Sequence, residues 1–316
     1  MKKILIDTDP GMDDTLAIIL GAKSSKTELL GVSSVAGNYP VEITTKNVLK
    51  TLELIGRPDI PVAKGMHKPL TRPLPDDPFS HGSDGMGEIF LPEPTTKISN
   101  KHGVDQIIDV VRANPGEVTV ICIAPLTNLA MAIMKEPQLV EEVKEVVCLA
   151  GSFGLNRYAF ENATADNPQA EWNVYVDPEA AKLVLQCGRP IVMMSLDVTH
   201  QVLTTQKRVD TIRNLDSSVG EGIAALIEFY ERYDEEKYHL DGAPLHDPCT
   251  VAYLLKPELF KFKNVNVEIE TGGTFTRGTT VVDYWEVTDR IPNVQWAYEV
   301  NDEGFFDLLN QYLSKI

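Results

Sequence analysis

The sequence predicts an α/β fold in which a mostly parallel, open sheet is flanked by helices, a Rossmann-like core. Two observations predict it. Apolar, strand-like runs alternate with segments of helical spacing along most of the chain, and the runs at residues 118–124 and 190–196 are almost continuously apolar. Such strands are typical of a parallel sheet that helices cover on both faces. No linker, repeat or low-complexity segment divides the chain, so residues 1–316 are expected to form a single domain.

The elements expected in the first third of the chain follow from local signals. The helix at residues 41–55 carries apolar side chains at helical spacing and stops at Gly56, with Pro58 beyond it. Residues 64–100 are rich in Pro, Gly and Asp, which indicates a long surface excursion, and excursions of this length are often functional. The expected strands here are residues 3–6, 28–35 and 60–63, and the expected helices are residues 16–20 and 41–55.

Regular alternation resumes after the excursion. Asp177-Pro178-Glu179 opens a helix, because Asp suits the N-cap and Pro suits the first turn. The expected strands are residues 118–124, 143–149 and 190–196, and the segments of helical character are residues 104–112, 126–134, 177–187, 204–240 and 247–255. Antiparallel strands are expected within residues 265–283, around the Gly272-Gly273 turn, as a small C-terminal extension. A further strand at residues 294–300 and an amphipathic helix close the chain.

The charge balance and the cysteines exclude several classes of protein. The net charge of −17 argues against nucleic acid or an anionic membrane as partner. The apolar run after Met1-Lys2-Lys3 is too short for a signal peptide, and no stretch is long and apolar enough to span a membrane. The cysteines form no CxxC pair and are expected to be buried free thiols of a cytoplasmic protein. They are Cys122, Cys148, Cys187 and Cys249.

The turn after the first expected strand concentrates acidic side chains. Asp7, Asp9, Asp13 and Asp14 fall within eight residues, between an apolar strand and an apolar helix. Pro10-Gly11 makes the turn between the two. Four carboxylates held between apolar segments would repel one another without a cation. The stretch therefore predicts a hard-metal site with oxygen ligands, of the Ca²⁺ or Mg²⁺ type.

Further polar residues follow other strands of the expected sheet. Ligands of open α/β sheets bind outside the carboxyl ends of the strands, so these residues are expected to lie near the aspartates. Asn38 follows the second strand, although alone it is better explained as a turn residue after Gly37. The strand at residues 118–124 brings Ile123-Ala124-Pro125, which is apolar, to the same edge, and the loop after residue 149 carries the polar Glu171 and Asn173.

Two motifs contain histidine. In His246-Asp247-Pro248, Asp247 before Pro248 is typical of an N-cap followed by Pro at the first helical position. His246 is one of only six histidines, and its coupling to a carboxylate at a helix start also suits a ligand together with a general acid. His81, followed by Gly82-Ser83-Asp84-Gly85, lies in the excursion and alone indicates an exposed loop.

Taken together, these motifs resemble the inosine-uridine preferring nucleoside hydrolase family. The resemblance runs in order almost from end to end, and such a series is far more specific than one short motif. The carrying residues are Asp7-Thr8-Asp9-Pro10-Gly11-Met12-Asp13-Asp14, Val35-Ala36-Gly37-Asn38, His81-Gly82-Ser83-Asp84-Gly85-Met86-Gly87, Pro125-Leu126-Thr127-Asn128-Leu129-Ala130, Ala170-Glu171-Trp172-Asn173-Val174-Tyr175-Val176-Asp177-Pro178-Glu179-Ala180-Ala181 and His246-Asp247-Pro248.

The resemblance implies a Ca²⁺-dependent enzyme that hydrolyses the N-glycosidic bond of ribonucleosides to ribose and free base. It implies metal-activated water and a transition state that resembles an oxocarbenium ion. The implied calcium ligands are Asp9, Asp14 and Asp247 and the backbone carbonyl of Ile123, with Asp9 also taking a proton from water. Asp7 and Asp13 are implied to lie near the metal and the ribose.

The resemblance also implies the substrate contacts and the partners. Asn38, Glu171 and Asn173 correspond to residues that bind the ribose hydroxyls, and His81 and His246 to residues that face the base. The leaving base would be protonated by His246 or by a tyrosine such as Tyr230 or Tyr233. The implied partner is a small-molecule ribonucleoside, in nucleoside salvage, and the implied assembly is a homodimer or a homotetramer.

Parts of the pattern leave alternatives open. Trp172 stands where Phe is common in the family and is familiar in purine-specific relatives, but those relatives lack the His of His246-Asp247-Pro248. Either Asn162 or Asn167 fits the place of an Asn near the metal. Two other functions fit parts of the sequence: a Mg²⁺-dependent phosphohydrolase of the haloacid dehalogenase type, and a nucleoside-binding protein without catalysis. Pro10, where the phosphohydrolases have Gly after Asp-x-Asp, and the intact acidic set argue against these two.

Overall fold

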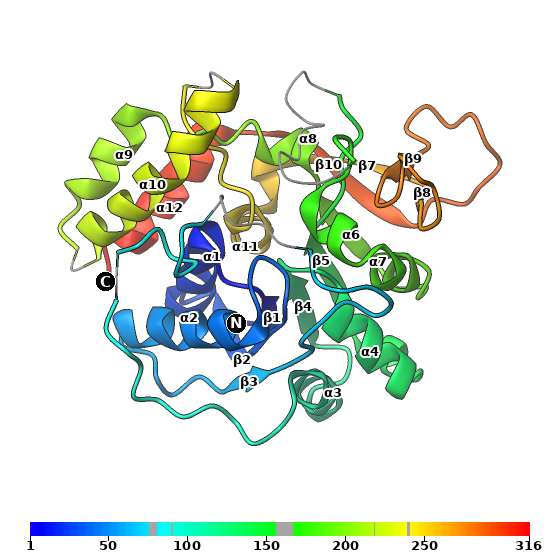
Figure 1. Cartoon of the computed structure of the whole chain (residues 1–316), viewed down its shortest axis with the longest axis horizontal. Helices are drawn as coiled ribbons and strands as arrows, with labels where there is room; N and C mark the ends of the chain where they lie inside the picture. The colour runs from blue at the N-terminus through cyan, green and yellow to red at the C-terminus, as the bar shows by residue number, and fades with distance from the viewer. Residues whose placement is uncertain (76–80, 90, 156–166, 218, 239–240) are drawn as a thin grey trace.

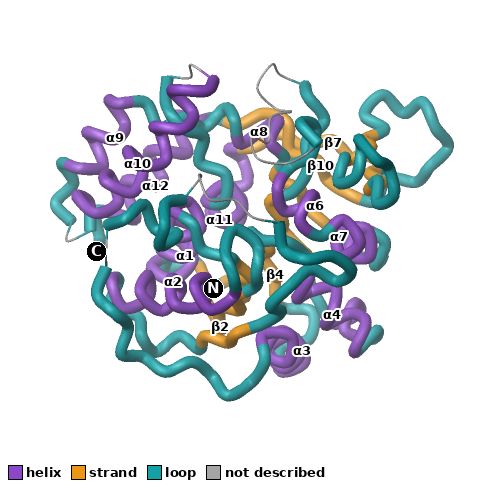
Figure 2. Tube along the Cα trace, in the orientation of Figure 1, coloured by secondary structure: helices purple, strands orange, loops and turns teal. Residues whose placement is uncertain are grey.

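The centre of the computed structural model is an eight-stranded sheet in the order β3-β2-β1-β4-β5-β6-β10-β7. Figure 2 shows these strands in the middle of the molecule with helices around them. The structure describes residues 1–75, 81–89, 91–155, 167–217, 219–238 and 241–316, with the backbone alone described for residues 231–238. The strands are β1 (Lys2–Thr8), β2 (Thr27–Ser34), β3 (Val62–Lys64), β4 (Val118–Cys122), β5 (Glu145–Leu149), β6 (Ile191–Met194), β10 (Val294–Val300) and β7 (Phe260–Val265).

The sheet is parallel except at one edge. Each neighbouring pair from β3 to β10 runs parallel, and β7 pairs antiparallel with β10. The alternation of side chains explains why the strands are so apolar. Ile4 and Ile6 of β1 join the buried cluster on one face, whereas Leu5 joins the cluster on the other. Both faces of the sheet are therefore covered and shielded from water, as the sequence predicted.

Two groups of helices cover the two faces. One face is covered by α1 (Met12–Lys23), α2 (Val41–Leu54), α9 (Gln206–Arg213), α10 (Gly220–Tyr238), α11 (Pro248–Leu255) and α12 (Asp302–Leu313). The other is covered by α3 (Gly103–Ala113), α4 (Thr127–Lys135), α5 (Leu139–Glu142) and α7 (Pro178–Leu185). In Figure 1, α9, α10 and α12 lie together at one end of the molecule, opposite β8 (Val267–Ile269) and β9 (Thr280–Val282). These two strands form the small antiparallel sheet that the sequence predicted.

The order of the strands reverses between β1 and β4. From β1 the chain moves through α1, β2 and α2 to β3 at one edge, and from β4 it moves outward in the opposite direction through β5 and β6. Helices after β1 and β4 lie on opposite faces, so a crevice opens at the carboxyl ends of these two strands. The acidic turn after β1 stands at this switch point, which is where an open α/β sheet binds its ligand.

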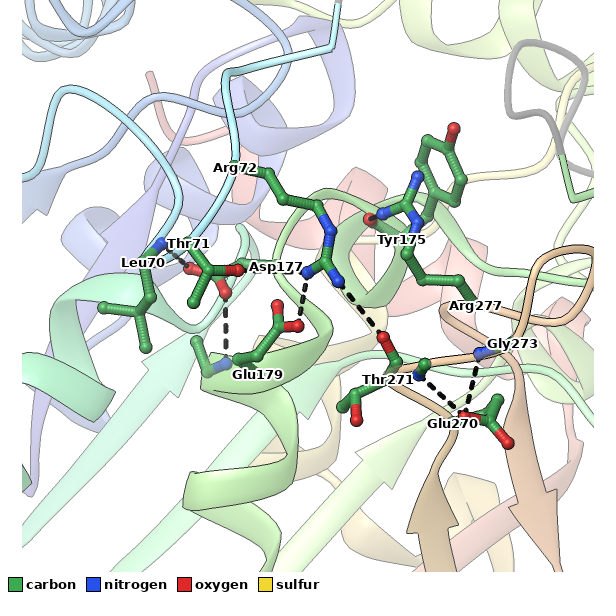
Figure 3. Close-up of polar contacts among 12 residues, drawn as sticks. Leu70, Thr71, Arg72, Tyr175, Asp177, Glu179, Glu270, Thr271, Gly273 and Arg277 are labelled. Atoms are coloured by element: carbon green, nitrogen blue, oxygen red, sulfur yellow. Dashed lines mark hydrogen bonds and ion pairs between the residues drawn. The ribbon is translucent and has the colours of Figure 1, made fainter.

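The long excursion between β3 and α3 is tied to the rest of the fold by Asp177 (Figure 3). Asp177 Oδ1 caps α7 by accepting from the Ala180 amide at 3.1 Å. Its Oδ2 accepts from Thr127 Oγ1 at the start of α4, at 2.7 Å, and from the Leu70 amide of the excursion, at 2.9 Å. A second tie is Arg72, which pairs with Glu179 and donates to the Thr271 carbonyl at 3.1 Å.

Several short elements differ from the sequence expectations. The strand expected at residues 190–196 ends at Met194, because the chain turns into α8 (Leu196–Thr199). Neither α8, α5 nor α6 (Trp172–Val176) is long enough to show a helical period, so no pattern predicts them. β7 and a 3₁₀ turn at Pro257–Leu259 were also not predicted, and residues 204–240 hold two helices. No helix among the described residues is long and apolar enough to cross a membrane.

Replacing Asp177 tests the tie between the excursion and the sheet. Asp177→Ala removes a helix cap and leaves the Thr127 hydroxyl and the Leu70 amide without an acceptor, so we expect a loss of about 3 kcal/mol in the free energy of unfolding. Asp177→Asn keeps one acceptor oxygen and should lose less than half as much. Urea unfolding measures both. Equal losses from the two variants would contradict the role assigned to the carboxylate.

Candidate active site

Asp9 lies just after β1 and is held by the turn after β2. Its Oδ2 accepts from the Asn38 amide at 2.7 Å, and the Asn38 side chain donates to the Asp9 carbonyl at 3.3 Å. Gly37 makes this approach feasible, since a Cβ there would lie 1.9 Å from Asp9 Oδ2. The other oxygen, Asp9 Oδ1, is buried and has no hydrogen-bond partner among the described residues. Asp9 is thus oriented with one oxygen left for a ligand.

Asp14 stands in the first turn of α1, where the helix dipole favours a negative charge. Its Oδ1 accepts from Thr8 Oγ1 at 2.5 Å and from the Asp9 amide at 3.3 Å, and its Oδ2 accepts from the Gly11 amide at 2.9 Å. Both oxygens are fixed by donors from the preceding turn. Oδ2 accepts only one hydrogen bond and keeps a lone pair, so Asp14 is a rigid candidate ligand.

Asp247 occupies the N-cap position of α11, as the sequence predicted, but its side chain does not cap the helix. Its backbone is already helical at this position, with φ −61° and ψ −40°, and the Thr250 hydroxyl donates to its carbonyl at 2.6 Å. The carboxylate is buried, and its Oδ1 has no partner among the described residues. The N-cap interpretation of Asp247 is therefore wrong for its side chain, because the carboxylate does not cap α11 and can instead contact the other buried acids.

Asp13, Asp14 and Asp247 each place a carboxylate oxygen within 4.8 Å of the others. Burial, followed by the charge of Asp13, raises the pKa of Asp14 to about 6. The pKa values of Asp9 and Asp247 rise well above the ordinary range, first through burial and then through neighbouring carboxylates. A hard cation would give the unpartnered oxygens a partner and would offset the repulsion between the carboxylates, so these residues fit such a cation. The geometry groups Asp13 with Asp14 and Asp247, whereas the resemblance implied Asp9 as the third carboxylate.

Asp7 forms a second layer beneath this group. Its Oδ1 accepts from Ser33 Oγ at 2.6 Å and from Asn128 Nδ2 at 2.8 Å, and its Oδ2 is buried without a partner among the described residues. Burial raises the pKa of Asp7 to about 7. Its carbonyl accepts from the Ile123 amide at 2.9 Å, which continues the pairing of β1 with β4. Ile123 is thereby brought to the same edge of the sheet.

Glu171 and Asn173 belong to the start of α6 rather than to an open loop. Glu171 is the N-cap of α6, and its carboxylate accepts from the Asn173 amide at 2.8 Å, the Val174 amide at 3.1 Å and the Gly151 amide at 3.2 Å. Burial raises its pKa to about 7. Asn173 Nδ2 donates to the Leu149 carbonyl at 3.2 Å. Both residues therefore stand against the end of β5, at the edge that carries Asp9.

Histidines and a tyrosine form an aromatic wall beside the acidic group. His81 stacks on Tyr230 with ring centroids 5.6 Å apart and an interplanar angle of 4°. A Cβ on Gly11 would meet the His81 ring at 2.6 Å, so this glycine lets the excursion close onto the acidic turn. His81 lowers the pKa of Asp13, which burial raises more strongly.

His246 lies next to Asp247, just before α11. Its Nδ1 lies 2.7 Å from Thr199 Oγ1, and its ring centroid lies 5.3 Å from that of His200. Burial, followed by the charge of His81, lowers the pKa of His246 to about 3. The imidazole is therefore neutral near neutral pH.

Three other residues considered from the sequence have different outcomes. The side chain of Tyr233 and the whole of Asn162 lie outside the described residues. Asn167 is described, and its side chain is hydrogen-bonded to Arg277 and Thr279 at 3.1 and 2.7 Å and to the Gln169 amide at 3.0 Å. It fixes a turn to the β8–β9 loop.

Thr199 and His200 are the site residues that sequence reasoning missed. They follow β6 at its carboxyl end, so the rule that found Asn38 and Glu171 also applies to them. The signal was hidden because residues up to 196 were expected to be strand, and no motif marked the short helix α8.

Comparisons with known proteins identify the family and the fold. A family model described as inosine-uridine preferring nucleoside hydrolase matches residues 4–307. The chain is 41% identical over 312 residues to the pyrimidine-specific ribonucleoside hydrolase RihA of Klebsiella pneumoniae, covering 98% of each chain. Its fold matches a solved plant nucleoside hydrolase with a TM-score of 0.90 and 33% identity, over 100% of this chain and 99% of that one. It matches a purine-preferring ribonucleoside hydrolase from Gardnerella vaginalis with a TM-score of 0.90 and 32% identity, over 99% and 98%.

If the acidic group holds a cation, Asp247→Asn should separate metal binding from stability. With chelator present, the variant should be at least as stable as the parent chain, because one of the clustered charges is gone. Calcium at about 100 times its dissociation constant should stabilise the parent by about 2.7 kcal/mol and the variant hardly at all. Asp109→Asn, at a half-exposed acid on α3, is the matched control and should respond to calcium like the parent. An undiminished calcium response in Asp247→Asn would contradict the assignment.

Calcium should stabilise the protein more at about pH 7.5 than at about pH 5. Asp7 and Asp14 have folded pKa values of about 7 and about 6, above the 3.8 of an ordinary Asp, so the metal-free fold holds protons that the unfolded chain releases. The stability that these protons give the metal-free fold is therefore lost as the pH rises through the two folded pKa values. Calcium binds only the ionised carboxylates, so its stabilising effect grows over the same range. The lowered pKa of His246 makes the fold more stable as the pH rises, which is the opposite effect. It acts equally with calcium and with chelator and therefore cancels in the difference. Thermal unfolding with calcium and with chelator gives the difference, and a calcium effect independent of pH would contradict the mechanism.

Proposed function

The chain belongs to the inosine-uridine preferring nucleoside hydrolase family, and we propose that its active site hydrolyses the N-glycosidic bond of ribonucleosides to ribose and free base. The observation that carries the proposal is the convergence of Asp9, Asp14 and Asp247 at the switch point of the sheet. Two of these carboxylates keep an oxygen that no described residue hydrogen-bonds, and His81 and His246 stand beside them. This assignment decides against the haloacid dehalogenase alternative, whose phosphoryl chemistry belongs to another family.

We propose that Ca²⁺ is the cofactor. Asp9, Asp14, Asp247 and the carbonyl of Ile123 would hold it, with the Asp13 carboxylate close by. Several carboxylates together with a main-chain carbonyl suit calcium, which takes six to eight oxygens, better than magnesium, which keeps much of its water. When bound, the ion would lower the pKa of a coordinated water and hold the ribose diol.

We assign to Asp9 the role of taking the proton from the attacking water. Its Oδ1 is buried and has no hydrogen-bond partner among the described residues, so it can accept that proton. The carboxylate-rich crevice tolerates the positive charge that develops on the ribose ring. Asp13, Asn38, Glu171 and Asn173 surround this position from α1, the β2 turn and α6, and we assign them to the ribose hydroxyls.

The aromatic wall receives the base. His81 and Tyr230 provide parallel ring faces, and His246 provides a polar edge next to Asp247. We assign leaving-group stabilisation to His246, with Tyr230 and Tyr233 as further contacts on α10. The curated relative is named pyrimidine-specific and the structural neighbour purine-preferring, so we propose ribonucleosides as the substrate class without a preference among bases.

We propose one catalytic domain over residues 1–316 that associates into a homodimer or homotetramer in the cytoplasm. The site draws on elements from β1 to α11 and is incomplete in any shorter piece. The loop after β9 exposes large apolar side chains at Trp285 (71%), Val287 (82%) and Ile291 (84%), which a second copy would bury. The free thiols of Cys122, Cys148 and Cys249 are buried, as suits a reducing compartment, whereas Cys187, also expected to be buried, is only partly so.

A panel of ribonucleosides, assayed for released reducing sugar with and without chelator, tests the function. Inosine, uridine, cytidine and adenosine should be compared with a phosphomonoester as the substrate of the rival phosphohydrolase. We expect ribose release that chelator abolishes and calcium restores. Asp9→Asn should lower kcat by 10²–10⁴, the usual contribution of a general base, with the fold unchanged.

Asp109→Asn on α3 serves as the control and should retain full activity. Near-normal turnover by Asp9→Asn would overturn the assignment of the base. Phosphate release without ribose release would overturn the proposed function itself.

A further inference from the structure

A buried threonine contacts the histidine assigned to the leaving base. Thr199 Oγ1 lies 2.7 Å from His246 Nδ1, although the two residues are 47 positions apart. Thr199 is the last residue of α8 and is fully buried. Its amide donates to the Ser195 carbonyl at 3.1 Å, so α8 fixes the position of its hydroxyl.

The contact also fixes which atom donates. Among the described residues, the Thr199 hydroxyl has no hydrogen-bond partner except His246 Nδ1. A buried hydroxyl has one proton to give, and in the described part of the chain this Nδ1 is the one acceptor that it contacts. The hydroxyl therefore donates to Nδ1, which must carry the lone pair. In a neutral imidazole the proton then sits on Nε2.

The surroundings leave the Nε2 edge of His246 for the substrate. His200 packs against the ring, with centroids 5.3 Å apart and an interplanar angle of 48°, and Thr199 occupies the Nδ1 edge. No described residue hydrogen-bonds Nε2, and His246 is only partly buried. The free nitrogen of this ring is therefore the one that carries the proton.

We propose that Thr199 is a positioning residue that holds His246 in the Nε2–H tautomer and so presents a hydrogen-bond donor to the leaving base. The proposal rests on the proposed hydrolase function for its consequence and on the geometry alone for the tautomer. As the N-glycosidic bond breaks, its electron pair moves onto the base. A donor at Nε2 stabilises that charge on a ring nitrogen or a carbonyl oxygen, whereas the other tautomer would present a lone pair and repel it.

Imidazole nitrogen NMR tests the tautomer directly. The full chain is labelled with ¹⁵N-histidine and loaded with calcium, and it has only six histidines to resolve. His246→Asn identifies the signal. In the parent chain and in Thr199→Ser, which keeps the hydroxyl, we expect a protonated Nε2 and a bare Nδ1. Thr199→Val, which keeps the shape, should lose this preference. A protonated Nδ1 in the parent chain would overturn the proposal, whatever the enzyme hydrolyses.

Kinetics test the consequence. Thr199→Val should lower kcat on natural ribonucleosides by about tenfold, the effect of roughly one lost hydrogen bond, with a small change in KM. A 4-nitrophenyl riboside, whose leaving group needs no donor, should lose less than about threefold. Thr199→Ser should restore the rate on both. Equal losses on the two substrates would overturn the positioning role. Absence of ribose release by the parent chain would instead refute the proposed function, and the NMR result would still decide the tautomer.

Discussion

Mutual repulsion among buried carboxylates is the constraint on which the rest of this structure depends. Asp9, Asp13, Asp14 and Asp247 are all buried in one crevice, and burial, followed by neighbouring acids, raises the pKa of Asp9, Asp14 and Asp247. Such a group is costly unless a cation compensates it or protons neutralise it. The switch point of the sheet is where the fold accommodates this cost, because strand ends and helix N-termini direct backbone amides toward the same crevice.

Much of the surrounding structure keeps these carboxylates apart and oriented. The Thr8 hydroxyl and the Gly11 amide hydrogen-bond the Asp14 carboxylate. The Asn38 amide hydrogen-bonds Asp9, and only a glycine at position 37 leaves room for this close approach. The helix after Asp247 begins without using its carboxylate as a cap. Elsewhere the same type of residue does cap, as Asp177 shows. The two Asp-Pro sequences therefore differ, because the Asp177 carboxylate caps its helix and the Asp247 carboxylate lies with Asp13 and Asp14.

The sequence determined the long elements and the centre of the site, because each rests on a local pattern. Apolar runs gave the strands, and the Asp7 to Asp14 motif placed the acidic turn. What could not be predicted depends on contacts between distant segments. Neither the free carboxylate of Asp247 nor the contact between Thr199 and His246 has a local signal, since each is set by how α8 and α11 meet in space. Short elements such as α6 also escaped, and with them the role of Glu171 as a helix cap.

We propose that these carboxylates form a calcium site whose protons are displaced when the ion binds. Isothermal titration calorimetry in two buffers of different ionisation enthalpy measures the stoichiometry and the protons released together. At about pH 6 we predict one Ca²⁺ per chain with net release of protons, and no binding by Asp14→Asn. Absence of calcium binding by the parent chain, or binding that persists in Asp14→Asn without proton release, would contradict the account.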